Sequence, residues 1–110
     1  MSINTTAVLE TSARRLFPDK TVEQVLAQLL SERAQRNLIR YQSLARQFEV
    51  KYNQKFDAFR QQVLNAQPSW DTEQDYFDWE LATSGITDME KEIERLRDLG
   101  EHGMVSGLEI

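Results

Sequence analysis

The sequence predicts an all-α protein, a helical hairpin or bundle of about four helices. Two of these helices are long, at about 21–52 and 70–99. In both segments apolar residues recur at steps of three and four, which keeps one side of a helix apolar, and the first segment contains no glycine or proline. Such alternating steps are typical of coiled-coil-like packing. Because a helical chain of 110 residues encloses only a small core, we also expect a dimer.

The first helix is predicted to run from Thr5 or Thr6, which are good N-cap residues, to Leu16. Pro18 ends it, because proline disfavours helical geometry at the preceding residue. Thr21 caps the second helix, whose apolar side changes along its length. The early side consists of Val22, Val25, Leu26, Leu29 and Leu30. The later side consists of Ala34, Leu38, Tyr41, Ala45, Phe48 and Tyr52. We therefore expect the first turns to pack against one element and the later turns against another.

Asn53 can adopt a left-handed turn and is expected to end the second helix. A short helix follows at 55–65, with an apolar side made of Phe56, Phe59 and Val63. After the linker at 66–69, Ser69 caps the long acidic helix at 70–99.

Residues 1–100 are predicted to form a single helical domain, with an N-terminal helical pair at 5–52. Gly85 weakens the acidic helix by about 1 kcal/mol relative to alanine. The apolar seam nevertheless stays in register through this position, so we expect one helix. Residues 101–110 contain two further glycines and are predicted to be a flexible tail.

The composition excludes several classes of protein. The chain has no cysteine, which excludes a disulfide framework, a thiolate nucleophile and a zinc–sulfur site. No run approaches the roughly 18 apolar residues that a membrane span needs, and the N-terminus lacks an apolar signal core. We therefore expect a cytoplasmic protein without a membrane partner.

The net charge of −5 is unevenly distributed. Residues 1–66 carry ten Lys/Arg and six Asp/Glu, a net charge of +4, whereas residues 67–110 carry three and twelve, a net charge of −9. A basic half and an acidic half can dock against each other or face two different partners. The alternative is that the charges are solvated faces that keep the helices soluble.

The long acidic helix is the candidate binding element. Its seam consists of Trp79, Ala82, Ile86, Met89, Ile93 and Leu96. The neighbouring face carries Asp71, Glu73, Asp75, Asp78 and Glu80. Trp79 either packs in the core or anchors a partner, because tryptophan is enriched at interface hot spots. The residues predicted to bind a partner are Asp71, Asp75, Tyr76, Asp78, Trp79, Glu80, Ile86 and Met89.

A metal site and an enzyme active site are weaker hypotheses. Asp71, Asp75 and Asp78 share a helical face that suits a hard cation such as Mg²⁺. A single helix seldom converges three short carboxylates, so we predict no metal and no cofactor. Trp70 is expected to be a partly exposed staple at the start of the acidic helix. No nucleophile with a base, no glycine-rich phosphate loop and no paired buried acids can be assembled, so we do not expect an enzyme.

Arg33, Arg36 and Arg40 form a predicted basic strip at the point where the apolar side of the second helix changes. This strip either pairs with the acidic helix or binds phosphates. The acidic balance of the whole chain argues against nucleic acid as the main ligand, which leaves the chain's own promoter as a secondary possibility.

Four groups of residues together carry a resemblance to a known family of proteins. They are Arg15-Leu16-Phe17-Pro18-Asp19-Lys20; Glu32-Arg33-Ala34 with Asn37-Leu38; Phe48-Glu49 with Lys51-Tyr52 and Phe56; and Asp75-Tyr76 with Asp78-Trp79-Glu80 and Ala82. With these groups the chain resembles small all-helical antitoxin-like proteins of bacteria, including cyanobacteria, and archaea, which are encoded beside ribonuclease-type toxins. The resemblance covers roughly residues 10–98, and the segment 75–82 is its most specific part. Members often carry glycine where this chain has Asn53.

The resemblance implies a non-enzymatic antitoxin that neutralises a cognate small toxin. In that view the carboxylates of the acidic helix occupy a basic RNA-binding cleft, while Trp79 and the seam supply buried area. One rival is a structural helical homodimer or adaptor without a toxin partner. A second rival is a DNA-binding autoregulator that uses Arg14, Arg15 and the basic strip.

Overall fold

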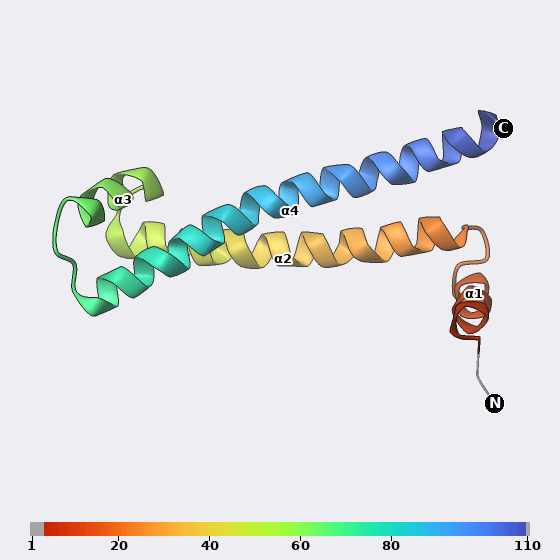
Figure 1. Ribbon diagram of the computed structural model, residues 1–110, viewed down its shortest axis with the longest axis horizontal. Coiled ribbons are helices and arrows are strands. Elements are labelled where there is room, and N and C mark those ends of the chain that lie inside the picture. The colour runs from red at the N-terminus through yellow and green to blue at the C-terminus, as the bar shows by residue number, and fades with distance from the viewer. Residues whose placement is uncertain (1–3, 110) are drawn as a thin grey trace. The chain divides into compact units, whose positions relative to one another are not determined.

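A computed structural model describes the backbone of residues 4–109 and the side chains of residues 4–99. The described chain is all-helical, with four helices and no strand, as the sequence predicts (Figure 1). The helices are α1 (Thr5–Leu16), α2 (Val22–Tyr52), α3 (Phe56–Leu64) and α4 (Trp70–Glu109). No described helix contains a segment with the length and apolar character that a membrane crossing requires.

Local capping explains where three of the helices begin. The backbone N–H of Gln24 donates to Thr21 Oγ1 at 3.1 Å, and the backbone N–H of Thr21 donates to Gln24 Oε1 at 2.8 Å, which makes a reciprocal capping box for α2. Ser69 Oγ accepts from the backbone N–H of Thr72 at 3.2 Å and caps α4, as predicted. The N-cap of α1 is Asn4 instead of the predicted Thr5 or Thr6, because its side-chain oxygen accepts from the backbone N–H of Ala7 at 3.1 Å.

The two long helices are continuous. α2 runs without a break for 31 residues and ends before Asn53, whose φ of 51° is the left-handed conformation expected there. α4 extends to Glu109 instead of ending near residue 99. The predicted end relied on Gly100, but a glycine weakens a helix by only about 1 kcal/mol, and no proline follows to stop it. The flexibility of residues 101–110 stays a prediction.

The chain divides into two compact units. Unit 1 comprises residues 1–33 and 92–110, of which the structure describes the backbone of 4–33 and 92–109. Unit 2 comprises residues 34–91. Because α2 and α4 contribute residues to both units, this division does not test the prediction of a single domain over residues 1–100.

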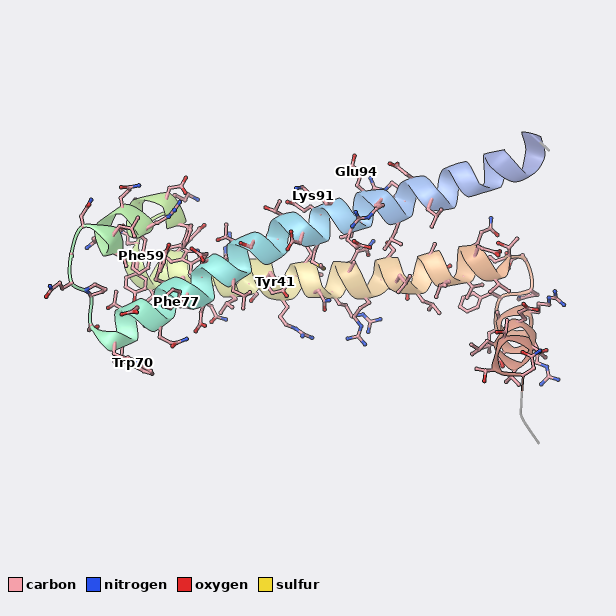
Figure 2. All side chains as sticks on the ribbon, in the orientation of Figure 1. Tyr41, Phe59, Trp70, Phe77, Lys91 and Glu94 are labelled. Carbon is pink, nitrogen blue, oxygen red and sulfur yellow. The ribbon has the colours of Figure 1, made fainter. Side chains whose placement is uncertain are left out.

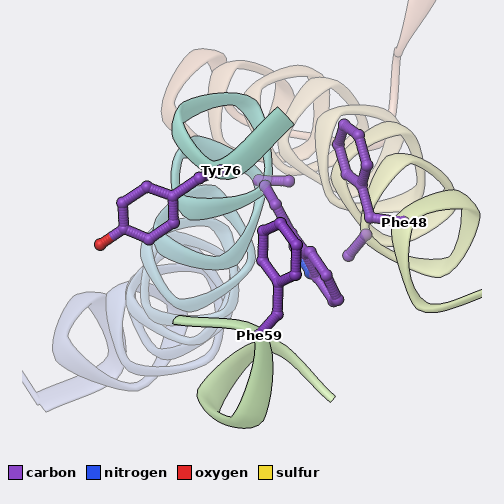
Figure 3. Packing of buried hydrophobic residues seen from close by; sticks show 6 residues of the cluster. Phe48, Phe59 and Tyr76 are labelled. Atoms are coloured by element: carbon purple, nitrogen blue, oxygen red, sulfur yellow. The ribbon is translucent and has the colours of Figure 1, made fainter. Parts of the chain in front are cut away.

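In unit 2, α2 and α4 pack as an antiparallel helical hairpin. Three contacts fix the register: a Cβ atom added to Gly85 would lie 2.7 Å from the ring of Tyr41, Phe48 stacks on Trp79, and Tyr52 donates to Asp75. Partners later in α2 thus lie earlier in α4. α3, which joins the ends of the two long helices, contributes Phe59 to the core between them (Figures 1 and 3).

Trp79 occupies the centre of the unit 2 core. Its side chain is 1% exposed, and its indole ring lies within 5.0 to 6.2 Å of four other aromatic rings, measured between ring centroids. These rings belong to Phe48, Tyr52, Phe56 and Phe59. Figure 3 shows Phe48 and Phe59 reaching this core from α2 and α3. Burial of several aromatic side chains is the largest source of stability that a domain of this size has available.

Unit 1 has a thinner core. Val25 and Ala27 of α2 and Ile93 and Leu96 of α4 are buried, whereas α1 contains no buried residue. Val25 and Ala27 face nearly opposite sides of α2, since two residues advance a helix by about 200°. The expectation that the first turns of α2 pack against a different element from the later turns stays a prediction.

Candidate protein-docking face on α4

The part of α4 in unit 2 has one apolar side inside the molecule and a second one outside. Trp79 lies nine residues after Trp70, which is two and a half helical turns, so the two indoles point in opposite directions. Phe77 and Leu81 lie seven and eleven residues after Trp70, which is close to two and three whole turns, and therefore share its side. We call the surface formed by Trp70, Phe77 and Leu81 the outer stripe.

All three members of the outer stripe are exposed. Trp70 is 75% exposed, Phe77 51% and Leu81 63%. Figure 2 shows Trp70 projecting away from the helix pair at the start of α4. The sequence analysis expected Trp70 to be a partly exposed staple at the start of this helix, and its side chain is largely exposed. Large apolar side chains that share one exposed helical face are typical of protein-docking surfaces.

The sequence analysis missed Phe77 and Leu81. The signal that identifies them was present, because Trp70, Phe77 and Leu81 follow a second repeat with steps of seven and four residues. The stronger seam through Trp79 obscures this second repeat in the sequence. Packing determines which of two such repeats is buried. The seam through Trp79 is buried because it faces the aromatic rings of α2 and α3.

Four carboxylates border the outer stripe. By helical geometry Asp71 and Asp78 lie along one edge, and Glu73 and Glu80 lie along the other. None of the four forms an ion pair within the part of the chain that the structure describes. Asp78 accepts a hydrogen bond from Gln74 at 3.3 Å, and Glu80 accepts one from the Tyr76 hydroxyl at 2.9 Å. These contacts leave the negative charges uncompensated, so the border presents a field that attracts cations.

Asp75 differs from the other carboxylates of this helix. It accepts a hydrogen bond from Lys51 Nζ and another from the Tyr52 hydroxyl, each at 2.5 Å, so it joins the start of α4 to the end of α2. These two donors, Lys51 first, hold the pKa of the Asp75 carboxyl below its ordinary value. Burial raises the pKa of the Tyr52 hydroxyl, and the hydrogen bond to Asp75 raises it further. Asp75 thus positions α4, and its carboxylate is already used within the chain.

The remaining residues predicted to bind a partner lie on the inner side of α4. Trp79 and Tyr76 are buried, and Ile86 and Met89 are half-buried. Ile86 packs against the aromatic cluster of unit 2. Of the predicted partner-binding residues, the structure brings Asp71, Asp78 and Glu80 together beside the outer stripe and places Asp75, Tyr76, Trp79 and Ile86 in contacts within the chain.

The predicted basic strip is exposed. Arg33, Arg36 and Arg40 make no hydrogen bond and no ion pair within residues 4–99, so the described part of the chain does not contain the predicted pairing with the acidic helix. Arg33 belongs to unit 1, whereas Arg36 and Arg40 belong to unit 2. Exposed guanidinium groups without partners are available to phosphates or carboxylates.

Within the described residues, no group of three or more His, Asp or Glu side chains is arranged to hold a metal ion. The Asp71, Asp75 and Asp78 carboxylates do not converge, because Asp75 faces Lys51 and Tyr52. Comparison with known proteins gave no match to a protein-family model, to a curated protein or to a solved structure. The resemblance to antitoxin-like proteins therefore stays a prediction.

Proposed function

We propose that the chain is a non-enzymatic protein-binding module of the antitoxin type, which neutralises a small, basic toxin through the outer side of α4. The observation that carries this proposal is the outer stripe, three exposed apolar side chains on one helical face between two rows of carboxylates. The proposal keeps the acidic aromatic helix of the sequence analysis and assigns the contact to Trp70, Phe77 and Leu81 instead of Trp79.

The chemistry of this face favours one kind of partner. Tryptophan and phenylalanine supply large contact areas with few rotatable bonds. Truncating such a residue at a hot spot weakens binding by about 2 kcal/mol or more. The carboxylates on both edges require a partner surface that is apolar at its centre and basic at its rim. A ribonuclease-type toxin has a basic surface for RNA, and a row of carboxylates can replace the RNA phosphates there.

The core of unit 2 supports this face indirectly. Trp79 and its aromatic neighbours fix the rotation of α4 about its own axis, and the Asp75 contacts fix its first two turns against α2. A docking helix that is held rigidly loses less conformational entropy on binding. The inner residues therefore serve to position the stripe.

The test is a titration of the chain with the product of the adjacent open reading frame, produced separately. We expect a complex whose affinity falls at least about 100-fold in the double variant Trp70→Ala/Phe77→Ala, since two hot spots of about 2 kcal/mol each exceed the 1.4 kcal/mol that a factor of ten requires. Val50→Ala is the matched control, because Val50 is an equally exposed apolar residue on α2. We expect this control to bind like the wild type.

Charge reversal separates the electrostatic part of the proposal from the apolar part. Glu73→Lys/Glu80→Lys should weaken the complex and reduce its dependence on salt, because exposed charge pairs are screened as ionic strength rises. The chain should also suppress the ribonuclease activity of the partner. Equal affinity for the wild type and both double variants, or a partner whose activity is unaffected, would overturn the proposal.

A structural homodimer is the second candidate function, and the exposed leucines at the start of α2 favour it. Side-by-side packing of the long helices as a coiled coil would accompany such a dimer. Autoregulation of the chain's own promoter through Arg14, Arg15 and the basic strip is a further proposal. It is tested by binding of a promoter fragment at moderate salt, where Arg36→Ala/Arg40→Ala should reduce the affinity.

A further inference from the structure

Unit 1 leaves an apolar surface uncovered at the N-terminal end of the chain. α1 has no buried residue, and its apolar residues Val8, Leu9 and Leu16 are all exposed. An isolated helix of 12 residues is marginal in water, because nucleation is costly and few hydrogen bonds repay it. A helix with this composition gains its stability when its apolar side is covered.

The start of α2 shows the same feature. Leu26, Leu29 and Leu30 occupy positions i, i+3 and i+4 and share one side of the helix, yet each is about half exposed. Val25 and Ala27, which flank this side of α2, are buried within the chain. The leucine side therefore lies between two buried positions, and Arg33, one turn further on, ends its apolar character.

We propose that these six aliphatic residues of α1 and α2 bind a second copy of this chain. Single exposed leucines are ordinary, whereas here six large aliphatic side chains are exposed within 23 consecutive residues, three on one side of α1 and three on one side of α2. The set contains no aromatic residue, which distinguishes it from the outer stripe of α4. Aliphatic helix faces of this kind pair with one another by interdigitation.

The charges of this segment favour a second copy over a partner of opposite charge. Residues 4–33 carry four basic and four acidic side chains, so two copies meet without net repulsion. The signs are also separated along the chain: Arg14 and Arg15 occupy the last turn of α1, and Glu23 occupies the first turn of α2. In a two-fold arrangement the same patch contacts itself, so the arginines of each copy can meet the acids of the other. The outer stripe of α4 cannot pair in this way, because its carboxylates would repel a second copy.

Sedimentation equilibrium of the full chain tests the proposal. The wild type should have twice the monomer mass at micromolar concentration, and Leu26→Gln/Leu30→Gln should raise the dissociation constant by on the order of 100-fold or more. Both positions are exposed in the single chain, so α2 should stay folded, and the helix content measured by circular dichroism should fall by no more than the share of α1. The matched control is Ile39→Gln/Val50→Gln, two aliphatic positions of α2 in unit 2 that are more exposed than the two leucines, and it should leave the mass unchanged.

Three results would overturn the proposal: a wild type that is monomeric at these concentrations, a leucine variant that dimerises as tightly as the wild type, or a control that dissociates equally. This inference rests on the second candidate function, for which it names the surface, and its outcome is independent of the proposed binding of a toxin. Trp70→Ala/Phe77→Ala should weaken binding of the toxin and leave the dimer intact, so failure of one proposal is distinguishable from failure of the other.

Discussion

The two tryptophans of α4 have opposite environments although they lie nine residues apart on the same helix. Trp79 is 1% exposed and surrounded by four aromatic rings, whereas Trp70 is 75% exposed. The difference comes from helical register alone, because two and a half turns place the two side chains on opposite sides. The comparison shows that one helix carries two apolar repeats with different roles: the inner one holds unit 2 together, and the outer one is available to a partner.

The largest expected difference between the two sides is the loss of stability when the indole on each side is removed. Trp79→Ala should destabilise the fold by about 3–5 kcal/mol, because it leaves a large cavity among packed aromatic rings. This is a large fraction of the stability of a small domain and is expected to unfold part of the population. Trp70→Ala should change stability by no more than about 0.5 kcal/mol. Urea denaturation followed by circular dichroism measures both. Similar losses for the two variants would contradict the assignment of inner and outer sides.

The next effect concerns Gly85, which faces α2 on the inner side. A Cβ atom at this position would lie 2.7 Å from the ring of Tyr41. Gly85→Ala should therefore destabilise the fold by about 1–3 kcal/mol through overpacking, although alanine is the better helix former. Ser84→Ala is the matched control, because Ser84 is exposed on the same helix, and it should be neutral or slightly stabilising. Thermal unfolding measures both, and a stabilised Gly85→Ala would show that the helices approach less closely here.

A smaller effect concerns the contacts of Asp75 with Lys51 and Tyr52. The folded state holds the pKa of Asp75 below its ordinary value of 3.8, so the ionised carboxylate stabilises the fold. This contribution is complete above the unfolded-state pKa and is lost as the pH falls through the lower folded-state pKa. The stability difference between the wild type and Asp75→Asn should therefore be constant near neutral pH and shrink below about pH 4. A difference that is independent of pH down to pH 2 would contradict the role of the charge.

Tyr52→Phe removes one donor to the same carboxylate and keeps the ring that packs on Phe59 and Trp79. We expect a loss of about 1 kcal/mol, typical of a single hydrogen bond. Chemical denaturation at neutral pH measures this loss. A loss of stability as large as that of Trp79→Ala would contradict this prediction, because it would exceed the contribution of a single hydrogen bond.

The smallest effects belong to the outer stripe in the absence of a partner. Phe77→Gln and Leu81→Gln should each change stability by no more than about 0.5 kcal/mol, because both side chains already contact water in the single chain. Urea denaturation of the two variants, beside Trp79→Ala as the reference, measures the contrast. A large loss for either one would show that the outer side is part of the core.

Much of the fold could be predicted from the sequence because its signals are local. Thr21, Ser69 and Asn53 mark the helix ends that the structure confirms, and the steps of three and four indicate the inner sides of α2 and α4. The end of α4 was wrong because glycine alone does not stop a helix. The apolar residues in the first turns of α2 could not be divided into buried and exposed ones, since that depends on which neighbours are present.

The candidate site was harder to predict, for a physical reason. The sequence places Trp79 and a row of carboxylates on one helix, but burial depends on where α2 and α3 lie around that helix. Asp75 looks like any other acid in the row until Lys51 and Tyr52 are brought beside it from a position more than 20 residues away. Only the structure shows that Trp79 is used within the chain and that Trp70, Phe77 and Leu81 remain outside.

The most direct test of the docking face is fluorine NMR of the chain labelled with 5-fluorotryptophan, with the two signals assigned by Trp70→Phe. In the free chain we expect the Trp70 signal to shift between H₂O and D₂O and the Trp79 signal to stay unchanged. Addition of the unlabelled product of the adjacent open reading frame should move or broaden the Trp70 signal and remove its solvent shift. A solvent shift at Trp79 in the free chain, or a Trp70 signal that the added protein leaves unchanged, would contradict the account.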